Sequence, residues 1–254
     1  MAELQYCEIL KTNINVTNMQ DTLDYINRHI DVLRGRYICV SNVHTTVMSY
    51  ENRKYRAIQN RAAMALPDGA PLSKYSRFIG FKKAGRVTGP DLMVEIFRIS
   101  PQKGYRHFFY GATQQTLEDM KTTLQKDYPG IVIAGMYAPP FRTLTEEEDK
   151  EIIALINNAR PDFIWVGLGA PKQEQWMYHH RGKLNAVSIG VGAGFDYLAG
   201  NIKRAPRIMQ VFCLEWLYRL MQDPGRLWKR YVTTNTKFIR YILRERLKNR
   251  AKKG

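Results

Sequence analysis

Short apolar runs alternate with amphipathic segments from about residue 36 to residue 200. The runs are continuous, without the one-in-two polar alternation of a strand that has one face in water. Continuous apolar strands are typical of a parallel sheet that helices cover on both faces. The candidate strands are Tyr37–Ser41, Ala62–Leu66, His107–Tyr110, Ile131–Ala134, Phe163–Val166 and Ala186–Ile189.

The segments between these runs carry helical signals. Residues 19–33 space their apolar side chains three and four positions apart, with Thr17 or Asn18 available as the N-cap. Thr145 and Glu148 fit a capping box at the start of a later helix. Alternation of strand and helix predicts an α/β fold, with a Rossmann-like open, mostly parallel sheet between two helical layers.

The pattern changes after residue 200, where no further strand is predicted. Two helices are expected over residues 206–222 and 226–248, separated by Asp223–Pro224–Gly225. We therefore predict an α/β domain over residues 1–200 and a helical appendage over residues 201–254.

The positive charge of the chain is concentrated in this appendage. The formal net charge is +16, from 39 Lys and Arg against 23 Asp and Glu. Residues 203–254 hold 15 basic and 3 acidic side chains, a net charge of +12, whereas residues 1–202 hold 24 and 20, a net charge of +4. Such asymmetry indicates one surface for an anionic partner.

Basic and apolar side chains are interleaved along the appendage, which suits three interpretations. Basic helices with an aromatic face suit an anionic membrane surface, but they also suit nucleic acid, or a solvated helix whose apolar side packs on the domain. An apolar side on residues 206–222 could equally meet a second subunit, giving a homo-oligomer. The basic side chains concerned are Arg204, Arg207, Arg219, Arg226, Lys229 and Arg230.

The compartment is predicted from what the sequence lacks. Cys7, Cys39 and Cys213 are far apart and form no CxxC pair, which favours a reduced, cytoplasmic protein. The first residues do not resemble a signal peptide, and no apolar run reaches the ~20 residues that span a bilayer. A membrane would therefore be met from its surface.

Polar or glycine-rich segments follow four of the predicted strands, at the edge where open α/β sheets bind ligands. Glycine-rich turns let backbone amides approach a phosphate, although each is equally explained as a tight turn that needs positive φ. The sequence has neither the dinucleotide-binding fingerprint nor a P-loop. The segments are Ser41–His44, Pro67–Ala70, Gly167–Glu174 and Gly190–Asp196.

Two aspartates in these segments are candidates for chemistry. Asp68 could act as a general base on a substrate hydroxyl, or it could close an Asx turn. Asp196 could contact a nucleotide or cap the turn that follows it. No metal site is predicted, because the adjacent His179 and His180 would face different directions on a helix and no D-x-D pair occurs.

Taken together, six segments resemble the WecG/TagA/CpsF glycosyltransferases of bacterial cell-surface polysaccharide synthesis. They occur in the order found in that family, across residues 40–230. The segments are Ser41–His44, Ala65–Gly69, Arg86–Leu92, Gly167–Glu174, Gly192–Asp196, and Arg204–Pro206 with Glu215–Leu220.

The resemblance implies an inverting transferase that moves a sugar, typically N-acetylmannosamine, from a UDP-sugar donor to an undecaprenyl-diphosphate-linked acceptor. It implies no metal ion or other cofactor, and no nucleic acid as partner. It also implies an appendage that approaches an anionic membrane surface, on the inner face of the cell membrane, and helps to complete the site.

The resemblance also assigns roles to residues. Asp68 is similar to the catalytic base of the family, and Asn42, Arg86 and Gln173 to its substrate-binding residues. The UDP site would comprise Met136 and Tyr137 in a turn, Gly167, Gly169, Gly192 and Asp196. The cations that reach the diphosphate would be Arg219, Arg226 and Arg230.

Two other functions stay open from the sequence. Some family members are thought to work in pairs, so the chain could be a non-catalytic enhancer of another polysaccharide glycosyltransferase. A nucleic-acid-binding α/β protein would also account for the basic appendage, although no recognisable reading motif supports it.

Overall fold

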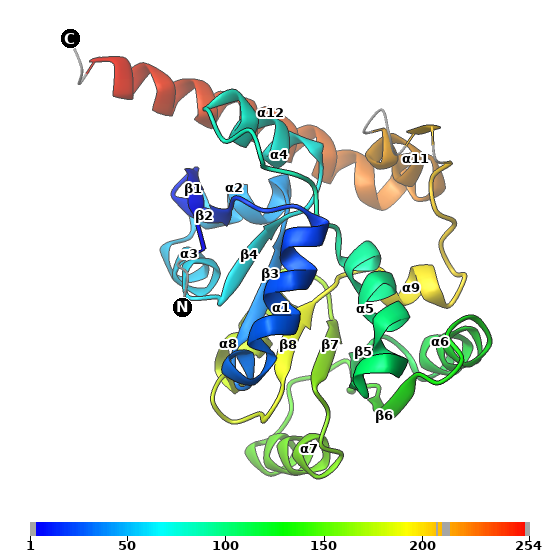
Figure 1. The fold of residues 1–254 in the computed structure, drawn as a ribbon. Helices are drawn as coiled ribbons and strands as arrows, with labels where there is room; N and C mark the ends of the chain where they lie inside the picture. Colours follow the sequence, from blue (N-terminus) through cyan, green and yellow to red (C-terminus); the bar gives the residue numbers. More distant parts are fainter. Residues whose placement is uncertain (1–3, 207, 210–213, 252–254) are drawn as a thin grey trace.

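The computed structural model describes residues 4–206, 208–209 and 214–251. Its centre is a six-stranded sheet in the order β4-β3-β8-β7-β5-β6, in which all neighbouring strands are parallel (Figure 1). Every predicted run forms one of these strands, with small shifts at the ends, so the predicted α/β class is confirmed. The strands are β3 (Tyr37–Ser41), β4 (Met64–Pro67), β5 (Arg106–Gly111), β6 (Val132–Tyr137), β7 (Phe163–Gly167) and β8 (Val187–Gly190).

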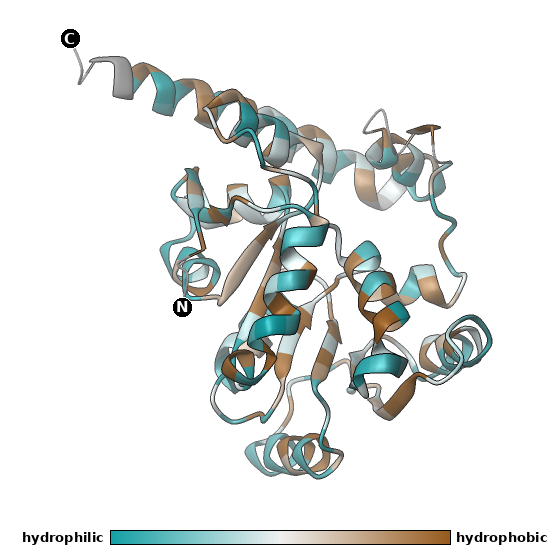
Figure 2. Ribbon diagram, in the orientation of Figure 1, coloured by the Kyte–Doolittle hydropathy of each residue, from teal (hydrophilic) through white to brown (hydrophobic). Residues whose placement is uncertain are grey.

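Helices cover both faces of the sheet. One apolar cluster joins the sheet to α1, α5, α6 and α9, and a second joins the opposite face to α3, α7 and α8. Figure 2 shows largely apolar strands beneath helices whose outward sides are hydrophilic. The helices of the two layers are α1 (Met19–Leu33), α5 (Gly89–Lys103), α6 (Gln114–Asp127) and α9 (Gly194–Leu198) on one side, and α3 (Arg53–Asn60), α7 (Glu146–Asn158) and α8 (Lys172–His180) on the other.

Both predicted capping signals are present. The Asn18 side chain accepts a hydrogen bond from the Asp21 backbone N–H at 3.0 Å, so Asn18 is the N-cap of α1. Thr145 and Glu148 form a reciprocal capping box at the start of α7. These bonds satisfy backbone donors that the first turn of a helix otherwise leaves free.

An antiparallel hairpin before α1 was not predicted. Strands β1 (Tyr6–Ile9) and β2 (Thr12–Asn15) are joined by Leu10 and Lys11, whose φ values are +48° and +62°. A tight hairpin turn of this kind usually contains Asn or Gly, because other residues adopt positive φ at a cost. The hairpin closes the β4 edge of the sheet, where the Asn15 side chain accepts a hydrogen bond from β4 at 2.7 Å.

The C-terminal helix packs on the α/β part of the molecule through a third apolar cluster. In α12 (Pro224–Ala251) the inward side carries Phe238, flanked by Tyr241 and Ile242. These side chains pack against α2 (Val43–Glu51), α4 (Ala70–Phe78) and the hairpin, and α12 runs past all three in Figure 1. The prediction of a separate 201–254 unit is not tested by this packing.

The two predicted C-terminal helices differ from the structure in their bounds. Of residues 206–222, α11 covers only Glu215–Gln222, while Arg207 and residues 210–213 lie outside the described residues. The break between the helices is narrower than predicted, because α12 already begins at Pro224. Proline fits the first position of a helix, where its missing N–H would have no partner.

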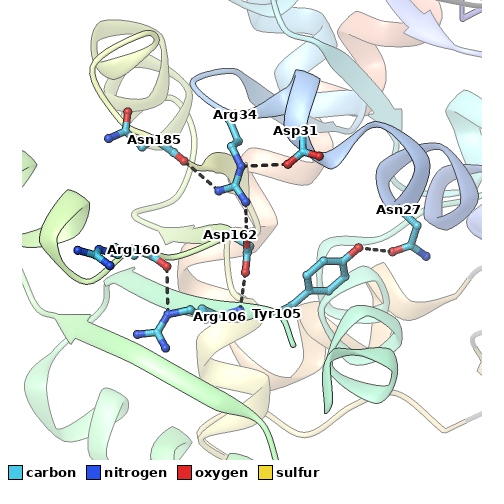
Figure 3. Close-up of polar contacts among 8 residues, drawn as sticks. All are labelled: Asn27, Asp31, Arg34, Tyr105, Arg106, Arg160, Asp162 and Asn185. Carbon is cyan, nitrogen blue, oxygen red and sulfur yellow. Dashed lines mark hydrogen bonds and ion pairs between the residues drawn. The ribbon is translucent and has the colours of Figure 1, made fainter. Parts of the chain in front are cut away.

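A polar cluster ties together the amino ends of the strands, at the edge of the sheet opposite the predicted site (Figure 3). The Asp162 carboxylate accepts hydrogen bonds from the Arg34 guanidinium at 2.7 Å and from the Arg106 backbone N–H at 2.9 Å. Arg34 also donates to the Asn185 carbonyl at 3.2 Å. Asp162 thus joins α1, β5 and the segments before β7 and β8.

We expect Asp162→Ala to lower the free energy of unfolding by about 2–3 kcal/mol, because two charge-assisted hydrogen bonds are lost and the Arg106 N–H loses its acceptor. Urea unfolding followed by circular dichroism measures this change. Asp31→Ala is the matched control: Asp31 meets the same arginine at 3.4 Å but its side chain is 87% exposed, so a change below about 0.5 kcal/mol is expected. Equal losses in the two variants would contradict the assignment.

Candidate active site

Three of the predicted site residues lie together at the carboxyl end of β3 and β4. Asn42 directly follows β3, and Asp68 follows β4 with its backbone N–H donating to the last residue of β3 at 2.7 Å. The segment that carries Arg86 runs alongside, since the Val87 N–H donates to the Pro67 carbonyl at 2.9 Å. The parallel sheet thus brings together residues that are distant in the sequence.

Asn42 has hydrogen-bond partners on both ends of its amide. Its Oδ1 accepts hydrogen bonds from the backbone N–H groups of His44 at 3.0 Å and Thr45 at 3.2 Å, and so caps α2. Because the oxygen serves the helix, the amide nitrogen is the group available to Asp68. Hydrogen bonding from Asn42 lowers the pKa of Asp68.

The Asp68 carboxyl group is partly buried, and burial raises its pKa to about 7. The positive charge of Arg86 opposes this rise, whereas the negative charges of Glu215 and Asp91 add to it. In the part of the chain that the structure describes, no backbone amide donates to the carboxylate, so Asp68 does not close an Asx turn. A carboxyl group with a pKa near neutrality is suited to proton transfer.

Two ion pairs near this carboxyl group join the α/β part of the chain to segments beyond residue 200. Arg86 is paired with Glu215 of α11, and Arg204 with Asp91 in the first turn of α5. Burial opposes ionisation of Asp91, but hydrogen bonds from Arg204 and from the Thr88 hydroxyl, the latter at 2.7 Å, lower its pKa overall. Segments on both sides of residue 200 therefore contribute charges beside Asp68.

Gln173, predicted to bind substrate, is buried and has protein partners at both ends of its amide. Its Oε1 accepts a hydrogen bond from the Gly192 N–H at 3.0 Å, and its Nε2 donates to Glu174 at 2.7 Å. Glu174 is fully buried, and burial raises the pKa of its carboxyl group. The pair therefore fixes the loop after β8, and Gln173 has one N–H and one lone pair left for a ligand.

The predicted glycine turns follow β7 and β8. Gly169 and Gly192 have φ values of +73° and +56°, as the turn interpretation requires, and open space lies where a Cβ would be. Gly167 serves packing instead, because a Cβ there would lie 2.7 Å from the Phe195 ring. A ligand can approach the backbone at Gly169 and Gly192, but the Gly192 N–H is already bonded to Gln173.

The prediction that Met136 and Tyr137 form a turn is wrong, because they are the last two residues of β6. At about 4.8 Å per strand, β6 lies roughly 14 Å from β8 and roughly 24 Å from β4, which Asp68 follows. The Tyr137 ring stacks on Tyr110 at a centroid distance of 6.0 Å. Asp196 lies in the first turn of α9, the helix that follows β8.

The predicted diphosphate cations belong to the C-terminal helices. Arg219 of α11 lies over the Tyr197 ring at 5.4 Å, and its Nη1 is buried without a hydrogen-bond partner among the described residues. Arg230 of α12 is exposed and lies near His44, whose pKa is lowered by burial and then by the charge of Arg230. The side chain of Arg226 lies outside what the structure describes.

Glu215 and Asp91 had no role assigned from the sequence, and Arg204 was named only among the basic side chains of the appendage. Their pairs span 129 and 113 residues, and neither helical nor strand periodicity links positions so far apart. The only available signal was their presence in the segments that carry the family resemblance.

In the described residues, no three His, Cys, Asp or Glu side chains gather in a way that could hold a metal ion. None of the helices in the same part of the chain is long and apolar enough to cross a membrane.

Comparison with known proteins gives consistent matches. The sequence model of the Glycosyl transferase WecG/TagA/CpsF family matches residues 7–252. The chain is 33% identical to an N-acetylglucosaminyldiphosphoundecaprenol N-acetyl-beta-D-mannosaminyltransferase of Bacillus subtilis, over 90% of this chain and 88% of the relative. Proteins of the same name match from Bacillus spizizenii, with 33% identity over 85% and 82%, and Staphylococcus aureus, with 31% over 88% and 85%.

The buried Glu174 gives a prediction on stability. Because folding raises its pKa, the folded protein holds a proton that the unfolded chain releases, so this group makes stability fall as pH rises above about 4.3. Glu174→Gln keeps an acceptor for Gln173 without the charge. We expect its free energy of unfolding to exceed that of the parent protein by a margin that grows as the pH rises above about 4.3.

Urea unfolding at several pH values measures this difference. Glu174→Leu removes the acceptor from Gln173 and should instead cost about 1–3 kcal/mol. The exposed Glu151→Gln on α7 is the control and should be neutral at every pH. A difference between Glu174→Gln and the parent that does not vary with pH would contradict the prediction.

Proposed function

The chain belongs to the WecG/TagA/CpsF glycosyltransferase family, and we propose that it transfers a sugar from a UDP-sugar to an undecaprenyl-diphosphate-linked acceptor. The names of its relatives support N-acetylmannosamine as the sugar and N-acetylglucosaminyl-diphosphoundecaprenol as the acceptor. The observation that carries the proposal is Asp68, a carboxyl group with a raised pKa that lies near Arg86 and, through the ion pair of Arg86 with Glu215, beside α11.

Asp68 acts as the general base. It takes the proton of an acceptor hydroxyl while that oxygen attacks the anomeric carbon of the donor sugar. The bond from this carbon to the UDP oxygen breaks, and its electron pair leaves with UDP. Attack opposite the leaving group inverts the anomeric configuration. Asn42, which holds the carboxylate, supports this step by fixing the direction of the base.

Arginines supply the positive charge that the leaving diphosphate needs. The buried Nη1 of Arg219, which has no hydrogen-bond partner among the described residues, can donate to a phosphate oxygen, and Arg230 lies near His44 in the first turn of α2. A planar guanidinium suits phosphate geometry, so the proposed transfer requires no divalent metal ion. Gly169, Gly192 and Asp196 offer open backbone and a carboxylate for the rest of the UDP group, with Met136 and Tyr137 at its far end.

The lipid-linked acceptor brings the protein to an anionic membrane surface, on the inner face of the cell membrane. The outward side of α12 supports this placement, because its apolar side chains form one exposed stripe beside Arg240 and Arg244. Figure 2 shows apolar and hydrophilic residues interleaved along this helix. The stripe consists of Trp228, Val232, Ile239, Leu243 and Leu247.

We expect Asp68→Asn to lower kcat by roughly 10²–10⁴-fold while donor binding is retained, because an amide cannot take the proton. In the parent protein, kcat should rise with pH through an apparent pKa of about 7, since only the ionised carboxylate is a base. UDP release from a panel of UDP-sugars with a prenyl-diphosphate-linked acceptor measures the rate.

Asp127→Asn, at an exposed carboxylate at the end of α6, is the matched control and should keep full activity. EDTA should leave the rate unchanged, and a requirement for divalent metal would contradict the arginine-based mechanism. A non-catalytic enhancer would respond differently: Asp68→Asn would leave its stimulation of a partner transferase unaltered.

We expect the double variant Ile239→Ser/Leu243→Ser to bind vesicles containing anionic lipid about 10- to 100-fold more weakly, since two exposed apolar side chains no longer enter the interface. Co-sedimentation with vesicles measures the binding. Leu155→Ser removes a similarly exposed apolar side chain from α7, at the opposite end of the molecule, and should bind like the parent (Figure 1). Equal binding by all three proteins would exclude the stripe as the membrane contact.

A further inference from the structure

The ion pair between Arg86 and Glu215 is the contact that brings α11 to the side of Asp68. Its partners are separated by 129 residues, and their side chains are only 21% and 30% exposed. Surface pairs such as Arg98 with Glu95 are more exposed, at 62% and 35%. Partial burial reduces screening by water, so this pair has more influence on neighbouring charges than a surface pair.

Arg86 lies among three carboxyl groups but bonds to only one of them. Its positive charge lowers the pKa of both Asp68 and Asp91. Asp91 has its own partners in Arg204 and Thr88. In the described part of the chain, no ion pair joins Arg86 to Asp68, and the guanidinium donates to Glu215 instead.

We propose that Glu215 is a positioning residue: by binding Arg86, it keeps the guanidinium from pairing with Asp68 and fastens α11 beside the site. The inference rests on the function proposed above, in which Asp68 is the base. An arginine bonded directly to Asp68 would stabilise the carboxylate and make it a poorer acceptor of the substrate proton. Glu215 prevents that pairing and adds its own negative charge nearby.

The Asp68 carboxylate is then basic enough to accept the substrate proton only while α11 is packed beside the site. The charged groups that face Asp68 are Arg86 before α5, Asp91 in α5 and Glu215 in α11, and Asn42 donates a hydrogen bond. Of these, Glu215 alone belongs to the segment beyond residue 200. Docking of α11 is therefore coupled to proton transfer at a residue that α11 does not itself supply.

Titration of the Asp68 carboxyl carbon by NMR in the full-length protein tests this inference, and Asp68→Asn identifies the signal. In Glu215→Gln the pKa of Asp68 should fall by about one unit, because a negative charge is lost and Arg86 is released. The acid limb of the kcat profile should move to lower pH by the same amount. The plateau should fall roughly three- to tenfold, since a weaker base accepts the proton less readily.

Glu245→Gln is the matched control, because Glu245 also lies in a C-terminal helix but accepts a hydrogen bond from Tyr50 at 2.7 Å, away from Arg86. It should leave the titration of Asp68 unchanged. Glu215→Ala is a second variant with the same expected shift as Glu215→Gln, should the latter fail to fold.

An unaltered Asp68 titration in the folded Glu215 variants would overturn the inference. A shifted titration combined with full activity of Asp68→Asn would separate the two proposals. The effect of Glu215 on the pairing of Arg86 and on the ionisation of Asp68 would then stand, whereas the role of Asp68 as base, and with it the catalytic importance of Glu215, would fail.

Discussion

Burial of the sheet on both faces is the constraint on which the rest of the structure depends. Six parallel strands with helices on either side leave only the two ends of the sheet for polar side chains. At the amino end, Asp162 and its arginines join neighbouring segments (Figure 3). At the carboxyl end, Asn42 and Asp68 come within reach of each other for the same geometric reason.

The strands and the capped helices could be predicted because their signals are local. Apolar runs indicate strands, and Asn18 and Thr145 begin helices through bonds to residues three positions away. The β1–β2 hairpin could not be predicted, since Leu10 and Lys11 adopt positive φ without the residues that usually announce such a turn. Tertiary packing of the hairpin and α12 around one cluster compensates for this local cost.

The candidate site was predictable to the extent that it follows strand ends. Asn42, Asp68 and the glycine turns lie where parallel strands stop, so their position follows from topology. The partners of the site residues do not follow from topology. Gln173 is hydrogen-bonded to Glu174 and Gly192, and Arg86 is paired with Glu215. Such pairs depend on how loops and C-terminal helices pack, and no periodicity in the sequence encodes that packing.

The attachment of α12 to α2 has a consequence for how the sequence can change over evolution. Glu51 at the end of α2 accepts hydrogen bonds from both Tyr241 and Lys237 of α12, while the first turn of the same helix is capped by Asn42. A substitution at Glu51 therefore alters the packing of α12 on α2, and α2 is the helix that begins at the site. The residues of α2 and α12 that contact each other should therefore covary among homologues. The residues of the outward stripe of α12 can be replaced independently of one another, provided that the replacements are apolar.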